Sequence, residues 1–189
     1  AIGFDAEFNP WLYFGTGRYL TAGDPSTTSV QTWYGIVDES TNTTIAGRGA
    51  LKARKIVAAG ELDNGSGTGV KVRAFEPQEF PSGVSDMYGK KGWYIDLVNP
   101  PFTAAQKVGE RIVGTPVVRG TTVLVSSIIP SEDPCTVEGS GYVNAVDALT
   151  GSSGVYGYES YFDVNGGGFA NDKLVSTIDG REVSIGSID

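Results

Sequence analysis

The sequence predicts an all-β fold built from short antiparallel strands. Apolar residues recur at every second position or in short continuous runs, which is the periodicity of strands rather than of helices. β-branched and aromatic residues, which favour strands, concentrate in these runs. Frequent turns are expected because the 189 residues include 27 glycines. With 40% hydrophobic and 11% aromatic residues, the chain has enough apolar side chains to form a core.

Seven strands are expected in chain order, at residues 11–14, 31–37, 70–75, 92–97, 115–119, 122–129 and 142–147. The first is an aromatic run that predicts a buried strand, closed by a Gly-Thr-Gly turn. Strict alternation in the third places Val70, Val72 and Ala74 on one face. The charged Lys71 and Arg73 share the other face.

Residues 49–59 are the one stretch with helical composition. Leu51, Ala53 and Lys55 also alternate, and we therefore expect a strand here that Gly60 closes. Loops are expected at 60–69, 130–141 and 151–157, where glycine and polar residues concentrate.

Composition excludes several classes of function. The 14 basic and 22 acidic residues give a net charge of −8, which is unfavourable for binding nucleic acid or anionic lipid. No apolar run approaches the ~20 residues that span a membrane, so no membrane insertion is expected. The chain contains no histidine, and a Cys–His or Ser–His catalytic pair cannot form within it.

Three further sets of residues are candidates for a catalytic or binding site. Cys135 is the single cysteine, so it is either a small buried side chain or the partner of a cysteine outside these residues. Adjacent acids, such as Glu132 with Asp133 or Asp38 with Glu39, point to opposite sides of an extended chain and do not form an acid–base pair. Arg18 is either a cation that faces a ligand or the ion-pair partner of a neighbouring carboxylate such as Asp38.

The chain contains a weak internal repeat, in which an apolar strand precedes a second strand that ends in an acidic turn. The two copies run from Trp11 to Asp38 and from Val123 to Asp147. The second continues into Asp-Ala-Leu-Thr-Gly, where Asp147 can accept hydrogen bonds from the following amides and Gly151 can adopt a positive φ. Such endings are typical of quinoprotein-like β-propeller blades, although a β-sandwich would use similar turns.

Several segments in order resemble the PilC/PilY family of type IV pilus biogenesis and adhesion proteins, in the C-terminal β-propeller region. They are PWLYFGTGRYL at 10–20, TSVQTWYGI at 28–36, KGWYIDL at 91–97, GERIV at 109–113, IPSEDPC at 129–135, GY at 141–142, DALTG at 147–151 and FDVNG at 162–166. The resemblance implies a modified β-propeller with antiparallel quinoprotein-like blades. It also implies roles in pilus assembly and surface adhesion, and no catalytic activity.

At ~40–50 residues per blade, 189 residues supply about four blades. The family's propeller is larger. We therefore expect residues 1–189 to form a single all-β domain that is the C-terminal portion of a larger propeller. The Asp-rich calcium loop that the family carries upstream is not found in this segment.

Calcium is the one cofactor that the sequence suggests. Residues 163–172 echo a calcium loop, with Asp163, Asn165 and Asn171 at positions 1, 3 and 9, and the Phe169 carbonyl at position 7. The pattern fails at position 5, which is a glycine, and at position 12, which is Leu174 instead of a bidentate glutamate. A glycine-rich surface turn is the alternative interpretation.

The sequence thus predicts a secreted, non-enzymatic module of a pilus tip protein that passes through the bacterial periplasm. Its partners would be pilin subunits or the remaining propeller blades of the same protein, and a host or abiotic surface. The working surface would be formed by the longest loops, 60–69, 77–91 and 130–141, at one end of the blades.

Two alternatives remain open at this point. One is a quinoprotein-like propeller enzyme, which the missing histidine disfavours. The other is a secreted carbohydrate-binding β domain, which would display tryptophan on its surface. Trp11, Trp33 and Trp93 all lie within expected strands and are therefore assigned to the core.

Overall fold

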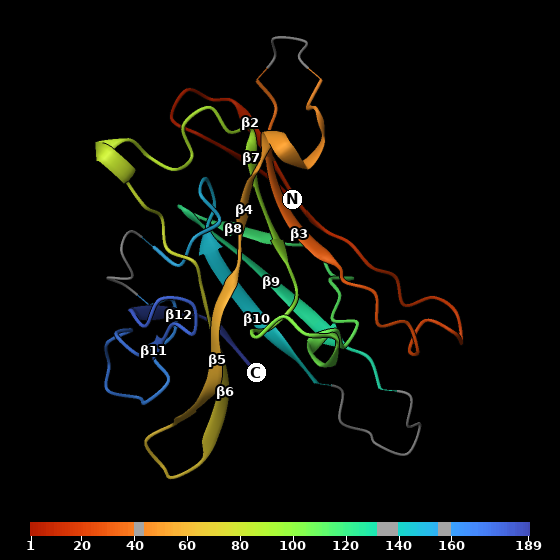
Figure 1. Ribbon diagram of the computed structural model, residues 1–189, viewed down its shortest axis with the longest axis vertical. Coiled ribbons are helices and arrows are strands. Elements are labelled where there is room, and N and C mark those ends of the chain that lie inside the picture. Colours follow the sequence, from red (N-terminus) through yellow and green to blue (C-terminus); the bar gives the residue numbers. More distant parts are fainter. Residues whose placement is uncertain (40–43, 132–139, 155–159) are drawn as a thin grey trace.

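Strands from distant parts of the chain form two sheets (Figure 1). The computed structural model describes residues 1–39, 44–131, 140–154 and 160–189. The first sheet has the order β1-β2-β3-β7-β4 and consists of β1 (Ile2–Phe4), β2 (Pro10–Gly15), β3 (Thr32–Val37), β7 (Gly92–Asp96) and β4 (Lys52–Arg54). Its pairs are antiparallel except for β4 with β7, which is parallel.

The second sheet has the order β5-β6-β12-β10-β9-β8. It consists of β5 (Ile56–Asp63), β6 (Gly69–Phe75), β12 (Glu182–Ile188), β10 (Ser140–Asp147), β9 (Thr122–Ile129) and β8 (Val117–Arg119), and β11 (Lys173–Val175) pairs with β12 off this path. Three short 3₁₀ helices, η1 (Gly47–Ala50), η2 (Pro81–Gly83) and η3 (Ala104–Gln106), lie in the connections. The expected all-β class and all seven expected strands are therefore confirmed.

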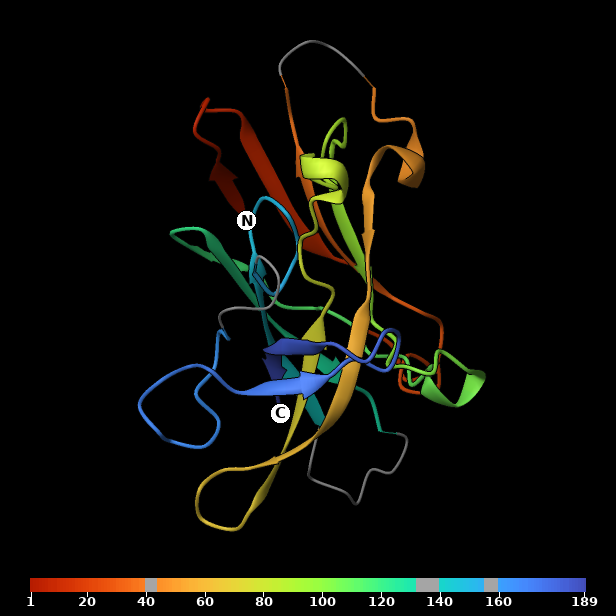
Figure 2. The same ribbon diagram turned by 60° about the vertical axis from the view of Figure 1, so that its left-hand side comes forward.

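The segment around residues 49–59 differs from its expectation in detail. It begins in η1 and forms two strands, β4 in the first sheet and β5 in the second, with Lys55 between them. Figures 1 and 2 show these two strands as one path that crosses between the sheets. Gly60 does not close the segment, because β5 continues to Asp63 and pairs with β6. The expected loop 60–69 is thus a hairpin whose turn spans only residues 64–68.

Three strands were not expected from the sequence: β1, β11 and β12. The most important is β12, which lies between β6 and β10 inside the second sheet. Its buried Ser184 and Ser187 give it no alternation between apolar and polar residues. A strand buried on both faces lacks the pattern that reveals a half-buried one.

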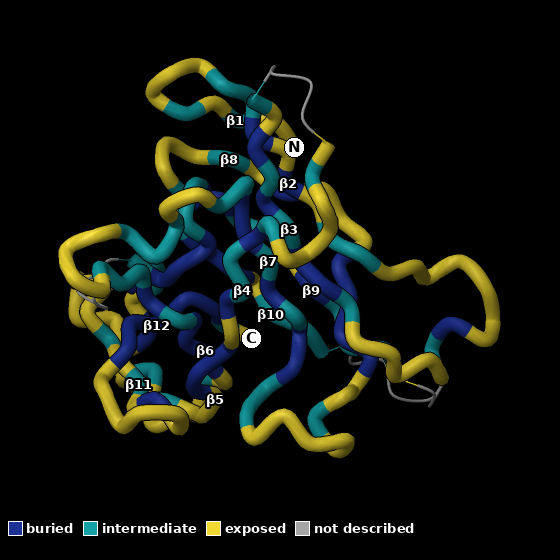
Figure 3. Tube along the Cα trace, turned by 45° about the horizontal axis from the view of Figure 1, so that its top comes forward, coloured by how far each residue is buried: buried dark blue, intermediate teal, exposed yellow. Residues whose placement is uncertain are grey.

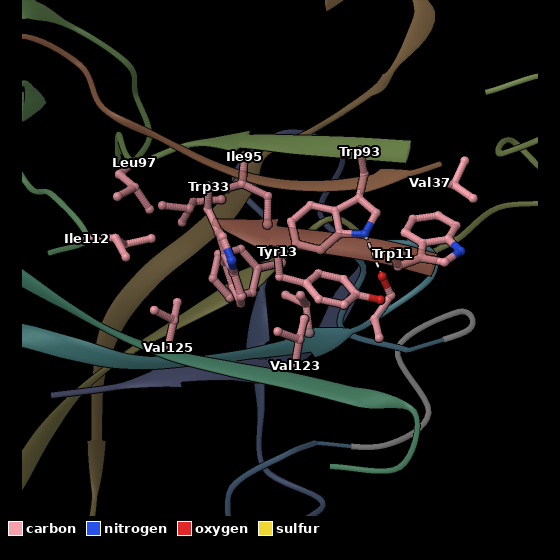
Figure 4. Close-up of a cluster of buried hydrophobic side chains, with 14 residues drawn as sticks. Trp11, Tyr13, Trp33, Val37, Trp93, Ile95, Leu97, Ile112, Val123 and Val125 are labelled. Atoms are coloured by element: carbon pink, nitrogen blue, oxygen red, sulfur yellow. Dashed lines mark hydrogen bonds between the residues drawn. The ribbon is translucent and has the colours of Figure 1, made fainter. Parts of the chain in front are cut away.

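The main core lies between the two sheets (Figure 4). Trp33 and Trp93 are fully buried from the first sheet, with their rings 5.3 Å apart in an edge-to-face arrangement. Val123 and Val146 contribute from the second sheet. The expectation that all three tryptophans belong to the core is confirmed, since Trp11 is also buried. Figure 3 shows that buried positions concentrate in the central strands, while the connections are largely exposed.

The second sheet also buries its other face. Val72, Val164 and Ile185 form a separate apolar cluster there, so the segment before β11 covers this face.

Arg73 is fully buried, which corrects the interpretation of its face as simply charged. Its guanidinium forms two hydrogen bonds with Glu110, at 2.7 and 2.8 Å, and a third with Asn144. Burial of this cation is possible because its donors are matched by a buried carboxylate and an amide oxygen.

The Asp-Ala-Leu-Thr-Gly turn after β10 forms as expected. One carboxylate oxygen of Asp147 accepts hydrogen bonds from the amides of Leu149 and Thr150, at 3.0 and 2.9 Å. Gly151 has a φ of +67°.

Both repeat copies are antiparallel strand pairs, β2 with β3 and β9 with β10. Among the described residues, no helix is long and apolar enough to cross a membrane.

Candidate interaction surface

An aromatic ladder crosses the face of the first sheet that points away from the core. Phe14 of β2 lies opposite Tyr34 of β3, and Tyr34 lies opposite Tyr94 of β7. Their ring centroids are 5.2 and 6.2 Å apart. These residues alternate with the buried Tyr13, Trp33 and Trp93 of the same strands, so the pleat alone places them on the outer face. We call Phe14, Tyr34 and Tyr94 the ladder.

Arg48 of η1 extends the ladder at its β7 end. Its guanidinium carbon lies 4.0 Å from the ring centroid of Tyr94 and 5.7 Å from that of Tyr34. The same guanidinium donates hydrogen bonds to Asp96 and, at 2.9 Å, to Thr32. Thr32 in turn donates to Asp96 at 2.6 Å. The guanidinium of Arg48 is therefore held over two rings, within the distance of a cation–π contact.

Apolar surface continues from the ladder toward β1. Leu12 and Phe14 are each 42% exposed, and Ile2 lies opposite Leu12 in the strand register. Beside Leu12 and Ile36 is a groove of about 440 Å³, whose far wall includes Ile45. A contiguous apolar surface of this kind marks an interaction site more often than a solvated face. The run Trp11–Phe14, expected as a buried strand, is therefore buried on one side only.

The sequence contained one signal for the ladder that was missed. In β2, β3 and β7, large apolar residues occupy both alternating sets of positions, although only one set can face a single core. The other set, which includes Tyr34 and Tyr94, needs a second covering layer or stays exposed. Only the strand register shows that these residues meet on one face.

Arg18 has a carboxylate partner, but it is Asp24 and not Asp38. The Nε of Arg18 donates to Asp24 at 2.9 Å. Asp24 also accepts hydrogen bonds from the amides of Leu20 and Thr21, at 2.7 and 2.8 Å. These two backbone hydrogen bonds hold the pKa of the Asp24 carboxyl far below its ordinary value, with Arg18 contributing in the same direction.

The candidate calcium ligands lie in one surface turn whose oxygens accept hydrogen bonds from the chain itself. Asp163 accepts from the amide of Gly168 at 2.8 Å, and Asn165 accepts from that of Gly167 at 2.7 Å. The Phe169 carbonyl accepts from the amide of Asn171 at 2.9 Å. In this arrangement the oxygens stabilise a glycine-rich turn.

Asp172, which was not among the candidate ligands, organises that turn. It accepts hydrogen bonds from the amide of Val164 and from the side-chain nitrogen of Asn165, both at 2.7 Å. Among the described residues, no three His, Cys, Asp or Glu side chains gather as a metal site would need. Asp163 is the one carboxylate among the candidate ligands, which is few for a calcium site.

Cys135, Glu132 and Asp133 lie outside the described residues. Glu39 forms an ion pair with Lys91. Two of the three expected loops do not gather at one end, which corrects that part of the expected working surface: Figure 1 places the β5–β6 turn at the bottom of the view and η2, within 77–91, at the upper left. Most of the third, 130–141, lies outside the described residues.

Comparisons with known proteins identify relatives of this segment, although no family model matches the chain. It is 37% identical over 165 residues to a type IV pilus biogenesis factor PilY1 homolog of Xylella fastidiosa. The matched residues are 87% of this chain and 12% of the relative. It is 27% identical over 150 residues to the type IV pilus biogenesis factor PilY1 of Pseudomonas aeruginosa, covering 74% of this chain and 12% of that protein. The chain thus spans about an eighth of the length of these relatives.

A solved structure has the same fold. The crystal structure of the Pseudomonas aeruginosa PilY1 C-terminal domain matches with a TM-score of 0.74 at 21% identity, over 100% of this chain and 38% of that domain. The expected fold, an all-β domain that forms part of a modified β-propeller, is confirmed by this likeness.

Proposed function

Because the chain belongs to the PilY1 family, we propose that it is a secreted, non-enzymatic module that acts in pilus assembly and in attachment to surfaces near the pilus tip. Its partners in this role are pilin subunits, a host or abiotic surface, and the remaining propeller blades of the same protein. The ladder is the observation that carries the proposal, because its aromatic side chains on the outer face of the first sheet suit docking and not catalysis.

The domain organisation fits this role. We propose that residues 1–189 form one domain and are the C-terminal portion of a larger propeller. The matched PilY1 C-terminal domain is more than twice as long as the part that this chain covers. Blades of a propeller pack face to face, and the outer face of the first sheet offers Leu12, Phe14 and Tyr34 for such packing.

The two alternatives have less support. An enzyme of the quinoprotein-like type would need acid–base groups placed around a substrate cleft. The groove beside the ladder does include Asp38, Glu39 and Lys91, but Glu39 is paired with Lys91 and the remaining lining is mainly apolar. A carbohydrate-binding domain would present flat indole rings, but Trp33 and Trp93 are fully buried. The ladder tyrosines instead lie beside Phe14 and the guanidinium of Arg48, and aromatic residues and arginine are enriched at protein interfaces.

Thiol accessibility tests this docking role. Phe14→Cys is made in a Cys135→Ser background, once in the 189-residue chain and once in a longer polypeptide that includes the preceding part of the propeller. The new thiol should react quickly in the short chain, because Phe14 is 42% exposed there, and at least tenfold more slowly in the longer protein.

Val175→Cys serves as the matched control, since Val175 is 62% exposed and lies on β11, which pairs with β12 of the second sheet and not with the ladder strands. Its reaction rate should be the same in both proteins. Equal rates for the two lengths at position 14 would contradict docking of the ladder against other blades.

A further inference from the structure

The β2–β3 connection, residues 16–31, is held rigid by a buried arginine. Arg111 is 2% exposed, and its guanidinium donates to the carbonyls of Arg18, Asp24 and Thr27 at 2.8, 2.9 and 2.6 Å. Its Nε donates to the carbonyl of Gly109 at 2.8 Å. Among the described residues, no carboxylate forms an ion pair with Arg111. This side chain therefore uses its donors to fix the path of a loop.

Two glycines make room for this arginine. A Cβ at position 17 would lie 2.4 Å from the Cβ of Arg111, and one at position 109 would lie 2.2 Å from the carbonyl oxygen of Thr27. Both residues have positive φ, at +118° and +69°. From the other side, the buried Asp24 holds the amides of Leu20 and Thr21. The loop is thus fixed through both its carbonyls and its amides.

What this rigid loop displays is a cation beside two apolar side chains. The side chain of Arg18 is 73% exposed, and Tyr19 and Leu20 are 48% and 86% exposed. Asp24 accepts a hydrogen bond only from the Nε of Arg18, so the two terminal nitrogens of that guanidinium form no hydrogen bond with it. Arginine and tyrosine are the residues most enriched at the energetic centres of interfaces.

Two hollows meet at Arg18. One is an apolar groove of about 570 Å³, whose walls include Phe14, Ile112, Val113 and Leu20. The other, of about 410 Å³, is lined mainly by polar groups that include Asp24 and Gln31. Figure 1 shows this connection as the orange-red loop that projects on the right.

We propose that this surface binds an extended peptide segment of a partner protein, with a carboxylate against Arg18 and apolar side chains in the groove of Ile112, Val113 and Leu20. Local charge favours the carboxylate, because Arg18 is a cation whose side chain is 73% exposed and whose terminal nitrogens form no hydrogen bond with Asp24. The aliphatic walls favour a peptide over a sugar, which needs many polar contacts. A fixed loop lowers the entropy cost of binding.

Peptide titration followed by NMR tests this surface on the 189-residue chain. The probe is acetyl-Val-Leu-Asp-Val-Leu-amide, and its partner probe carries Asn in place of Asp. Amide shifts should map to residues 18–21 and 112–114. The Asp peptide should bind about two- to fivefold more tightly than the Asn peptide, the range of an exposed ion pair.

Variants separate the two parts of the proposal. Arg18→Gln should remove the preference for Asp while leaving binding of the Asn peptide unchanged, and Val113→Ser should weaken both peptides equally. Arg119→Gln changes another exposed arginine outside both hollows and should change nothing. The proposal is overturned if no shifts appear near Arg18, if they map to Tyr34 and Tyr94 instead, or if Arg18→Gln keeps the preference. None of these outcomes depends on a pilus role.

Discussion

The indole nitrogen of Trp93 donates a hydrogen bond of 2.8 Å to the carbonyl of Ala148. Trp93 belongs to β7 in the first sheet, and Ala148 belongs to the turn that follows β10 in the second. Figure 4 shows this bond among the buried side chains. One residue thus packs the core between the sheets and fixes the turn beyond it.

Replacement of this tryptophan should therefore be costly. Trp93→Ala should lower the free energy of unfolding by ~3–5 kcal/mol, the range for loss of a buried aromatic side chain. Trp93→Phe should cost ~1–3 kcal/mol, since it keeps a ring but leaves the Ala148 carbonyl unpaired. Urea unfolding followed by circular dichroism measures both. We expect Trp11→Ala to resemble Trp93→Ala, and a near-neutral effect of either alanine variant would place its ring on the surface.

The close approach of Gly151 to Trp93 gives a second prediction. A Cβ at Gly151 would lie 2.5 Å from the indole ring, and the residue has a φ of +67°. Gly180 has a similar φ of +73°, with no atom within 4 Å of an added Cβ. Both alanine variants should lose about 1–2 kcal/mol through backbone strain. Gly151→Ala should lose a further ~1–3 kcal/mol through overpacking. Equal losses would show that the turn can move away from the ring.

Asp86 makes stability depend on pH in the acid range. Arg54, which is fully buried, donates two hydrogen bonds to Asp86 at 2.6 and 3.0 Å, and Lys52 lies 3.3 Å away. Burial would raise the pKa of the Asp86 carboxyl, but the hydrogen bonds and charges of Arg54 and Lys52 outweigh it and hold that pKa below 3.8.

Because the folded-state pKa is depressed, this stabilisation is complete above the ordinary pKa and is lost as the pH falls through the folded value. Asp86→Asn should cost ~1–3 kcal/mol near neutral pH. The difference between wild type and variant should stay constant from neutral pH down to about 5 and shrink as the pH falls further, through the ordinary pKa and then the depressed one. Unfolding midpoints across this range provide the measurement, and a difference that stays constant would separate Asp86 from the acid response.

Calcium binding at residues 163–172 stays a prediction, with weak affinity expected. Asp163 is the one carboxylate among the candidate ligands, and one of its two oxygens already accepts a hydrogen bond from the Gly168 amide. Dissociation constants no tighter than ~10⁻⁴–10⁻³ M follow, the range of extracellular modules. Isothermal titration with calcium should give a weak signal that Asp163→Ala removes. Identical heats from the two proteins, or none at millimolar calcium, would reduce this segment to a structural turn.

Most of the strand pattern was predictable because alternation is local. The strands β9 and β10, for example, carry β-branched residues at strand period and end in a recognisable turn. By contrast, β12 is paired along both edges, with β6 and with β10, and includes buried serines. Its sequence therefore shows no amphipathic signal.

Long-range partners were not predictable. Arg73 forms an ion pair with Glu110, 37 residues away in the sequence, and Arg54 forms one with Asp86, 32 residues away. In the sequence, each arginine has the features of a surface charge. Only the strand register and the position of a distant connection show that it is buried. The ladder was missed for the same reason, because Phe14 and Tyr94 share a face only once β3 lies between them.

The pilus role itself is tested most directly by counting surface pili in the native host. A strain whose protein lacks residues 1–189 should export the shortened protein, yet show few surface pili and poor attachment by electron microscopy and adhesion assay. A strain carrying Val175→Ser should match wild type, since this exposed residue lies on β11 beside the second sheet, outside the ladder and the Arg18 loop. Normal pilus numbers and normal attachment in the shortened strain, with the protein exported, would contradict a role for this module in pilus assembly and adhesion.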